Sequence, residues 1–137
     1  MCRAGSDGTP ESEGKIKMAQ VVALVDDLFF QAKLAETAKA LGVELRTCST
    51  PDALLAEIAQ NPPGLVVVDL NARNNPLDAV ARVQASAGHI PLLGFLSHIQ
   101  VDLAEKARAA GCHDVMSRSK FTRDLATILG QAKSERP

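Results

Sequence analysis

The segment VVALVDD, residues 21–27, decides the fold together with LVVVD, residues 65–69. Both are unbroken runs of apolar residues rather than alternations of apolar and polar ones. Such runs are typical of parallel strands that are covered on both faces. Both runs lead into aspartate, the first into Asp26 and Asp27 and the second into Asp69. The two segments therefore predict a sheet with a buried middle and acidic residues at the ends of its strands.

Strand-like and helix-like segments alternate along the rest of the chain. The predicted strands are residues 21–25, 43–48, 64–70, 90–95 and 113–116, and the predicted helices are residues 29–42, 51–60, 76–87, 101–111 and 121–132. Right-handed crossovers between parallel strands place the helices on both faces of the sheet. The sequence therefore predicts an α/β fold with a doubly wound, five-stranded parallel sheet.

Several helix ends carry capping signals. Gly42 follows the first predicted helix and provides a left-handed stop. Thr50 and Pro51 open the second helix as N-cap and first-turn proline. The segment from Ser97 to Gln100 has the pattern of a capping box, which predicts Ser97 as the N-cap of the fourth helix.

The apolar pattern also divides the chain. Residues 1–17 are polar, rich in Gly, Ser and Glu, and without an apolar period, which predicts a flexible N-terminal tail. Met18 directly precedes the first apolar run and is a candidate natural start. Residues 18–133 are expected to form one domain of sufficient size to bury a core, and residues 134–137 a short C-terminal tail.

Composition excludes several classes of function. The formal net charge of −1, with no Trp or Tyr, argues against nucleic acid as a partner. The chain has no run of 18 apolar residues and no hydrophobic signal core, so neither a membrane partner nor secretion is expected. The three cysteines, Cys2, Cys48 and Cys112, form no C-x-x-C motif. Their odd number and wide spacing favour reduced thiols and a cytoplasmic location.

The aspartates after the two central strands are candidates for one site. In open α/β sheets, ligands bind beyond the carboxyl ends of the strands, so Asp26, Asp27 and Asp69 are expected to meet in one cleft. Carboxylates that lie so close repel one another and require a counter-ion, for which Mg²⁺ with its preference for oxygen ligands is suited. The alternative is that Asp26 and Asp27 only cap the following helix. A pair of acids followed 42 positions later by a single acid favours the joint site.

The segments VALVDDLFF and LVVVDLN resemble the response-regulator receiver domain, the chemotaxis-regulator-like (CheY-like) family, over residues 19–131. The resemblance implies a flavodoxin-like strand order 2-1-3-4-5. It implies that Asp69 accepts a phosphoryl group from a phosphohistidine on a sensor histidine kinase. It further implies that Asp26, Asp27 and Asp69 hold Mg²⁺, Asp26 mainly through water, together with the backbone carbonyl of Asn71.

The sequence departs from the family pattern in the second half of the site. The family places Thr or Ser at the end of its fourth strand, where this chain has Leu96, so Ser97 is a candidate one position late. Arg118 stands where the family has a lysine followed by proline, and it is the candidate to contact Asp69 or its phosphoryl group. Lys120 is the alternative cation, with a solvated position as its simpler interpretation. Other departures are an asparagine-rich stretch at residues 71–75 and Val115 in place of an aromatic residue.

Two functions of different classes are expected from these residues. The first is a stand-alone two-component receiver, not an enzyme beyond self-catalysed phosphotransfer and autodephosphorylation. Its partners would be a sensor histidine kinase or phosphotransfer protein and a downstream protein target. The alternative is a pseudo-receiver that binds a protein partner without phosphorylation, and an unrelated flavodoxin-like ligand-binding domain is a more remote third. The resemblance also implies a surface for a homodimer, formed by the last strand and the last two predicted helices.

Overall fold

A computed structural model describes residues 20–134 except 74 and 98–99. The predicted tail at residues 1–17, the candidate start at Met18 and residues 135–137 lie outside the described residues. The strands are β1 (Val21–Leu24), β2 (Leu45–Cys48), β3 (Leu65–Asp69), β4 (Leu92–Leu96) and β5 (Asp114–Ser117). The helices are α1 (Leu28–Leu41), α2 (Pro51–Gln60), α3 (Pro76–Ala87), α4 (Val101–Ala110), α5 (Arg118–Arg123) and α6 (Leu125–Ser134).

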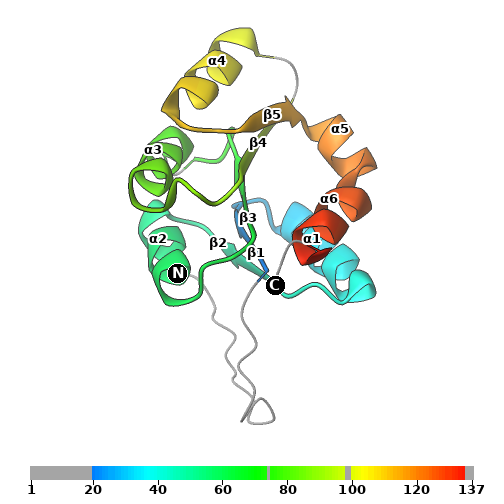
Figure 1. Cartoon of the computed structure of the whole chain (residues 1–137). Coiled ribbons are helices and arrows are strands. Elements are labelled where there is room, and N and C mark those ends of the chain that lie inside the picture. Colours follow the sequence, from blue (N-terminus) through cyan, green and yellow to red (C-terminus); the bar gives the residue numbers. More distant parts are fainter. Residues whose placement is uncertain (1–19, 74, 98–99, 135–137) are drawn as a thin grey trace.

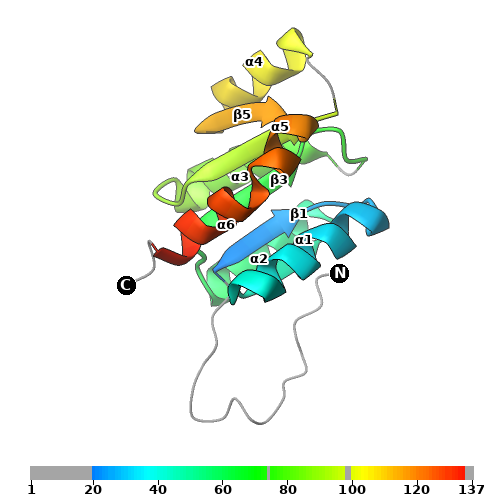
Figure 2. The same ribbon diagram turned by 90° about the vertical axis from the view of Figure 1, so that its right-hand side faces the viewer.

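The strands form one parallel sheet in the order β2-β1-β3-β4-β5, which confirms the predicted fold class and strand order. Helices α2, α3 and α4 cover one face, and α1, α5 and α6 cover the other (Figures 1 and 2). This double cover explains why β1 and the first four residues of β3 are all apolar.

Successive residues of β1 and β3 contribute to two separate cores. Val22 and Val66 pack with residues of α2 and α3, whereas Val21 and Val67 pack with residues of α1 and α6. Every residue of both strands is buried. These two strands therefore become accessible only beyond their ends, which is where the polar residues of the cleft lie.

The capping predictions hold at α1 and α2 but not at α4. Gly42 has a φ of 73° at the end of α1, and the Thr50 hydroxyl accepts a hydrogen bond from the Ala53 amide at 3.1 Å. The prediction of Ser97 as N-cap is wrong, because α4 begins at Val101 with Gln100 as its N-cap residue. The side chain of Gln100 forms no capping bond within the described part of α4.

The last predicted helix, residues 121–132, is two helices separated by a turn at Asp124. The first of them, α5, begins earlier than predicted, directly after β5. Ser117 caps it by accepting a hydrogen bond from the Lys120 amide at 3.1 Å. This early start makes Arg118 the first helical residue, so its position is determined by both a strand and a helix.

The two cysteines in the described part of the chain differ. Cys48 is disulfide-bonded, so the prediction of reduced thiols is wrong for this residue. Cys112 has a free, buried thiol, and burial raises its pKa to about 11. The Cys112 thiol is therefore protonated at neutral pH and unreactive as a nucleophile.

None of the helices within the described residues has both the length and the apolar character needed to cross a membrane.

Packing around β4 leads to a test of the fold. A Cβ atom at Gly94 would lie 2.9 Å from Cδ1 of Leu70 and 3.1 Å from Sγ of Cys112, whereas a Cβ atom at Gly130 in α6 would meet no atom within 4 Å. Gly94→Ala is expected to lower the free energy of unfolding by about 1–3 kcal/mol through overpacking. Gly130→Ala is expected to raise it by roughly 0.5–1 kcal/mol through helix propensity. Urea unfolding of the two variants measures both changes, and equal signs would contradict the packing described.

Candidate functional site

A cleft of about 630 Å³ lies at the carboxyl ends of the strands. Its lining contains all six residues that the sequence predicts for the site, from four different strand ends, together with one residue that was not predicted. They are Asp26, Asp27, Asp69, Asn71, Ser97 and Arg118, and the additional residue is Arg73. The fold thus brings the predicted side chains together, while their roles stay predictions.

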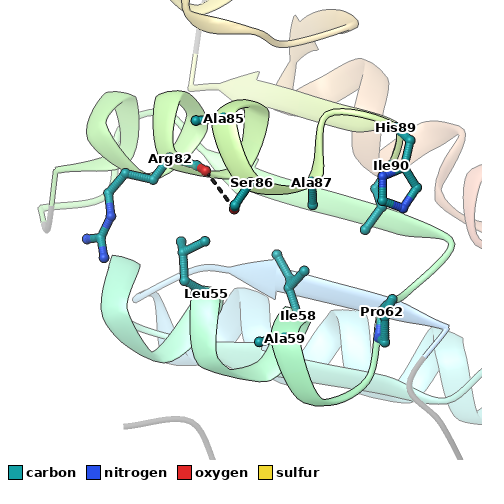
Figure 3. Close-up of a pocket in the computed structure, with 10 residues that line it drawn as sticks. All are labelled: Leu55, Ile58, Ala59, Pro62, Arg82, Ala85, Ser86, Ala87, His89 and Ile90. Atoms are coloured by element: carbon teal, nitrogen blue, oxygen red, sulfur yellow. Dashed lines mark hydrogen bonds between the residues drawn. The ribbon is translucent and has the colours of Figure 1, made fainter.

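A second cavity of similar volume, about 660 Å³, lies between α2 and α3 (Figure 3). Apolar side chains such as Leu55 and Ile58 form much of its wall. The guanidinium of Arg82 is paired with Asp52 at 3.0 Å, and the Ser86 hydroxyl donates to the Arg82 carbonyl at 2.9 Å. Arg82 and Ser86 are therefore engaged by protein, and the cleft at the strand ends, where three carboxylates meet a guanidinium, is the better candidate for chemistry.

Asp27 caps α1 and also lines the cleft. One carboxylate oxygen, Oδ1, accepts hydrogen bonds from the Phe29 and Phe30 amides at 3.0 and 3.2 Å and caps α1. The other oxygen, Oδ2, lies 3.4 Å from Nη2 of Arg118. The Phe30 amide makes the largest contribution to lowering the pKa of Asp27, and Arg118 adds to it.

Asp26 connects the β1 end to the loop after β3. Its Oδ2 accepts a hydrogen bond from the Arg73 amide at 3.0 Å. No sequence signal predicts this contact, since it uses the backbone of Arg73 and not its charge. The asparagine-rich stretch at residues 71–75 indicated only that a turn follows β3.

Asp69 is the most buried of the three acids, with 4% of its surface exposed. Its Oδ1 accepts a hydrogen bond from the Asn71 amide at 2.9 Å, and its Oδ2 lies 3.8 Å from Nη2 of Arg118. Burial raises the pKa of Asp69 and outweighs the lowering effects of the Asn71 amide and Arg118. The charges of Asp26 and Asp27 raise the pKa further.

Arg118 provides the positive charge among these acids, as the sequence resemblance suggested. The planar guanidinium lies over the ring of Phe30, with Cζ 4.3 Å from the ring centroid, and 5.7 Å from the centroid of Phe95. A cation–π contact of this kind contributes about 0.5–2 kcal/mol. Nε of Arg118 is buried and has no hydrogen-bond partner among the described residues. The alternative cation, Lys120, is exposed and pairs with Asp124 at 3.0 Å, away from the cleft lining.

Asn71 has a role that the sequence did not predict. Its side-chain Oδ1 accepts a hydrogen bond from the Ser97 amide at 2.6 Å, and its Nδ2 donates to Oε1 of Gln100 at 3.0 Å. The loop after β3 is therefore tied to the segment between β4 and α4. Ser97 is exposed at the cleft, whereas Leu96 is buried, so the residue one position late is the one that lines the site.

The three carboxylates offer the hard oxygen donors that Mg²⁺ prefers, so the donor set fits this ion in kind. Most of these oxygens already have protein partners. The engaged atoms are Asp26 Oδ2, Asp27 Oδ1 and Oδ2, and Asp69 Oδ1 and Oδ2. Within the described residues, no three His, Cys, Asp or Glu side chains are assembled as a metal-binding group. An ion shared by Asp27 Oδ2 and Asp69 Oδ2 would therefore compete with Arg118.

The pKa of Asp27 is lowered and that of Asp69 is raised, so replacing each by asparagine is expected to change the free energy of unfolding in opposite directions. Folding raises the pKa of Asp69 above the ordinary 3.8, so the ionised carboxylate lowers stability above the raised pKa, and this loss disappears as pH falls through it. Asp69→Asn is therefore expected to increase the free energy of unfolding at pH 7, because the neutral amide avoids the cost of a buried charge.

Asp27→Asn is expected to act in the opposite direction. Its lowered pKa means that the ionised carboxylate stabilises the fold at pH 7, and that this contribution is lost as pH falls through the lowered value. Urea unfolding in metal-free buffer compares the two variants with the wild type. A destabilised Asp69→Asn variant would contradict the conclusion that burial affects the pKa of Asp69 more than the Asn71 amide and Arg118 do.

Comparison with known proteins bears on the fold. No family model and no curated protein matches the chain. Solved structures do match. The receiver domain of NtrX from Brucella abortus superposes with a TM-score of 0.71 and 20% identity, over 85% of this chain and 99% of that domain. A putative response regulator from Chloroflexus aurantiacus superposes with a TM-score of 0.74 and 16% identity, over 87% and 100%. The BeF3-activated DrrB receiver domain gives 0.71 and 14%, over 87% and 100%.

The match is to one part of larger relatives. This chain covers 28% of a longer NtrX chain from Brucella abortus, but nearly all of the isolated receiver domain. At these identities the similarity concerns the fold. Five parallel strands in the order 2-1-3-4-5, with acids at the ends of β1 and β3, agree with it. The chain therefore has the fold of the response-regulator receiver domains.

Proposed function

We propose that this chain is a two-component receiver that accepts a phosphoryl group on Asp69 from a phosphohistidine. The donor would be a sensor histidine kinase or a phosphotransfer protein. The observation that supports the proposal is the presence of Asp26, Asp27, Asp69 and Arg118 in one cleft at the strand ends. In this reaction the donor imidazole carries a proton on its second ring nitrogen. The bond between histidine nitrogen and phosphorus breaks with its electron pair passing to nitrogen, an Asp69 oxygen–phosphorus bond forms, and neutral histidine is released.

The two oxygens of Asp69 are not equivalent in this proposal. Oδ1 is held by the Asn71 amide, whereas Oδ2 faces Arg118. We assign Oδ2 as the attacking oxygen. Arg118 then offsets part of the repulsion between the carboxylate and the incoming phosphoryl oxygens. The hydroxyl of Ser97, exposed at the same cleft, is available to donate to a phosphoryl oxygen.

Asp26, Asp27, Asp69 and the Asn71 carbonyl are the groups that would hold Mg²⁺. When bound, Mg²⁺ neutralises phosphoryl charge and aligns the displacement. Asp27 remains the cap of α1 through Oδ1, and Asp26 remains attached to the Arg73 amide. The acids are thereby held in position by backbone groups before any ligand arrives.

The proposed output is contact with a downstream protein, in the cytoplasm, without further enzymatic activity beyond phosphotransfer to itself and loss of that group. A phosphoryl group on Asp69 adds negative charge beside Asn71, whose side chain contacts both Ser97 and Gln100. A charge change at Asp69 thus reaches the start of α4 through two hydrogen bonds. Pairing of two copies through α4, β5, α5 and α6 stays a prediction from the family resemblance.

Acetyl phosphate tests the acceptor directly. With Mg²⁺ present, intact mass spectrometry is expected to show addition of one phosphoryl group to the wild type and none to Asp69→Asn. Ser97→Ala should retain labelling at a rate reduced by roughly a hundredfold to a thousandfold, the size expected for one lost transition-state contact. An unmodified wild type, under conditions that label a known receiver, would remove the basis of this proposal.

The second candidate is a pseudo-receiver that binds its partner without phosphorylation. The observation that favours it is the pairing of Arg118 with both Asp27 and Asp69, which supplies an internal cation where the family expects a metal ion. In this case Asp69 is a structural acid, and the cleft is closed to phosphoryl groups.

Beryllofluoride separates the two candidates, since the DrrB receiver domain is described as BeF3-activated. A phosphoacceptor is expected to show amide NMR shifts around Asp69, Asn71 and Gln100 on addition of BeF3⁻ and Mg²⁺, and Asp69→Asn none. An unchanged wild-type spectrum would support the pseudo-receiver.

A further inference from the structure

The guanidinium of Arg118 is held in two different ways. Phe30 and Phe95 lie against its plane, at 4.3 and 5.7 Å from Cζ to the ring centroids. Nη2 faces Asp27 and Asp69 at 3.4 and 3.8 Å. With Nε buried and without a partner among the described residues, the aromatic face and the two carboxylates are the observed restraints on this group.

Phe30 itself does not line the cleft. It is buried in the first turn of α1, in an aromatic cluster with Phe95 and Phe121. Any influence of Phe30 on the chemistry of the cleft must therefore be exerted through Arg118 or through the backbone of α1. Its close approach to the guanidinium indicates the first route.

We propose that Phe30 is a positioning residue: its ring holds Arg118 as a fixed cation between Asp27 and Asp69, and thereby lowers the affinity of the cleft for Mg²⁺. The proposal rests on the metal site of the proposed function. It concerns the strength of that site and not the phosphoryl transfer itself.

The physical basis is competition for the same two carboxylates. Asp27 and Asp69 would hold Mg²⁺, but both already face Nη2 of Arg118 through Oδ2, and two cations at one site repel each other. A long side chain that is free to swing into water would yield its place readily. A guanidinium stacked on a buried ring loses the aromatic contact when it leaves, and a lysine ammonium would lack the planar face for that stacking.

Mg²⁺ titration monitored by amide NMR tests the proposal, and the lack of Trp makes indole fluorescence unsuitable. Arg118→Met removes the cation and is expected to bind Mg²⁺ about fivefold more tightly, since one partly exposed charge pair is worth up to roughly that factor. Phe30→Leu is expected to bind Mg²⁺ more tightly than the wild type but less tightly than Arg118→Met. The double variant is expected to bind no more tightly than Arg118→Met, because Phe30 acts through Arg118.

Phe121→Leu is the matched control. Phe121 is fully buried and stacks on Phe95 at 4.7 Å between centroids, but no cation–π contact joins it to Arg118 among the described residues. This variant removes a ring from the same cluster and should leave the Mg²⁺ affinity unchanged. A gain in affinity that is confined to Phe30→Leu and Arg118→Met cannot arise from general damage to the core, which weakens sites.

Three results would overturn the proposal: Phe30→Leu binding Mg²⁺ no more tightly than the wild type, a further gain in the double variant, or no response to Mg²⁺ in any folded variant. If Phe30→Leu lacks the dispersed amide spectrum of a folded protein, Phe30→Met replaces it, with the same expectation. Acetyl phosphate labelling at saturating Mg²⁺ is scored separately. Labelling of Asp69 without an affinity gain rejects only the role of Phe30, and an affinity gain without labelling rejects only the phosphoacceptor.

Discussion

Mutual repulsion among three carboxylates is the constraint on which the functional end of this molecule depends. A parallel sheet brings the ends of β1 and β3 side by side, so Asp26, Asp27 and Asp69 lie in one cleft. Their charge is offset by the positive charge of Arg118 and by hydrogen bonds from the backbone amides of Phe29, Phe30, Asn71 and Arg73. These groups come from three parts of the chain, the first turn of α1, the loop after β3 and the first residue of α5, so the acidic cleft is complete only in the assembled fold.

The sheet prepares this site by its register as well as its order. Asp69 is paired with Phe95 across β3 and β4, and Leu96 is paired with Ser117 across β4 and β5. The first pairing places the aromatic residue Phe95 beside Asp69. The second brings the residue before Arg118 to the end of β4. The core on the α1 side of the sheet thus extends to the cleft and forms the apolar support of a charged side chain.

The fold could be predicted almost completely from the sequence, because continuous apolar strands and helical periods are local signals. The convergence of Asp26, Asp27 and Asp69 followed from the same signals, since strand ends in a parallel sheet share an edge. The stacking of Arg118 on Phe30 could not be predicted, because it joins residues 88 positions apart whose meeting depends on where α5 begins. The early start of α5 and its end at Asp124 were not predicted either. The apolar period alone places this helix later, whereas the cap by Ser117 begins it at Arg118.

Ser97 does not cap α4 as its sequence pattern predicts, and it instead makes a tertiary hydrogen bond with Asn71. Ser97 donates its amide to Asn71, and α4 begins only at Val101. Its first amides receive no side-chain cap from Gln100, whose carboxamide oxygen is bonded to Asn71 instead. The residue that precedes α4 is therefore bound to the loop after β3 rather than to its own helix. If Asn71 moves, the carboxamide oxygen of Gln100 loses this partner and becomes available to the uncapped amides of α4, so a displacement in one loop changes the hydrogen bonding at the start of a helix on another strand connection.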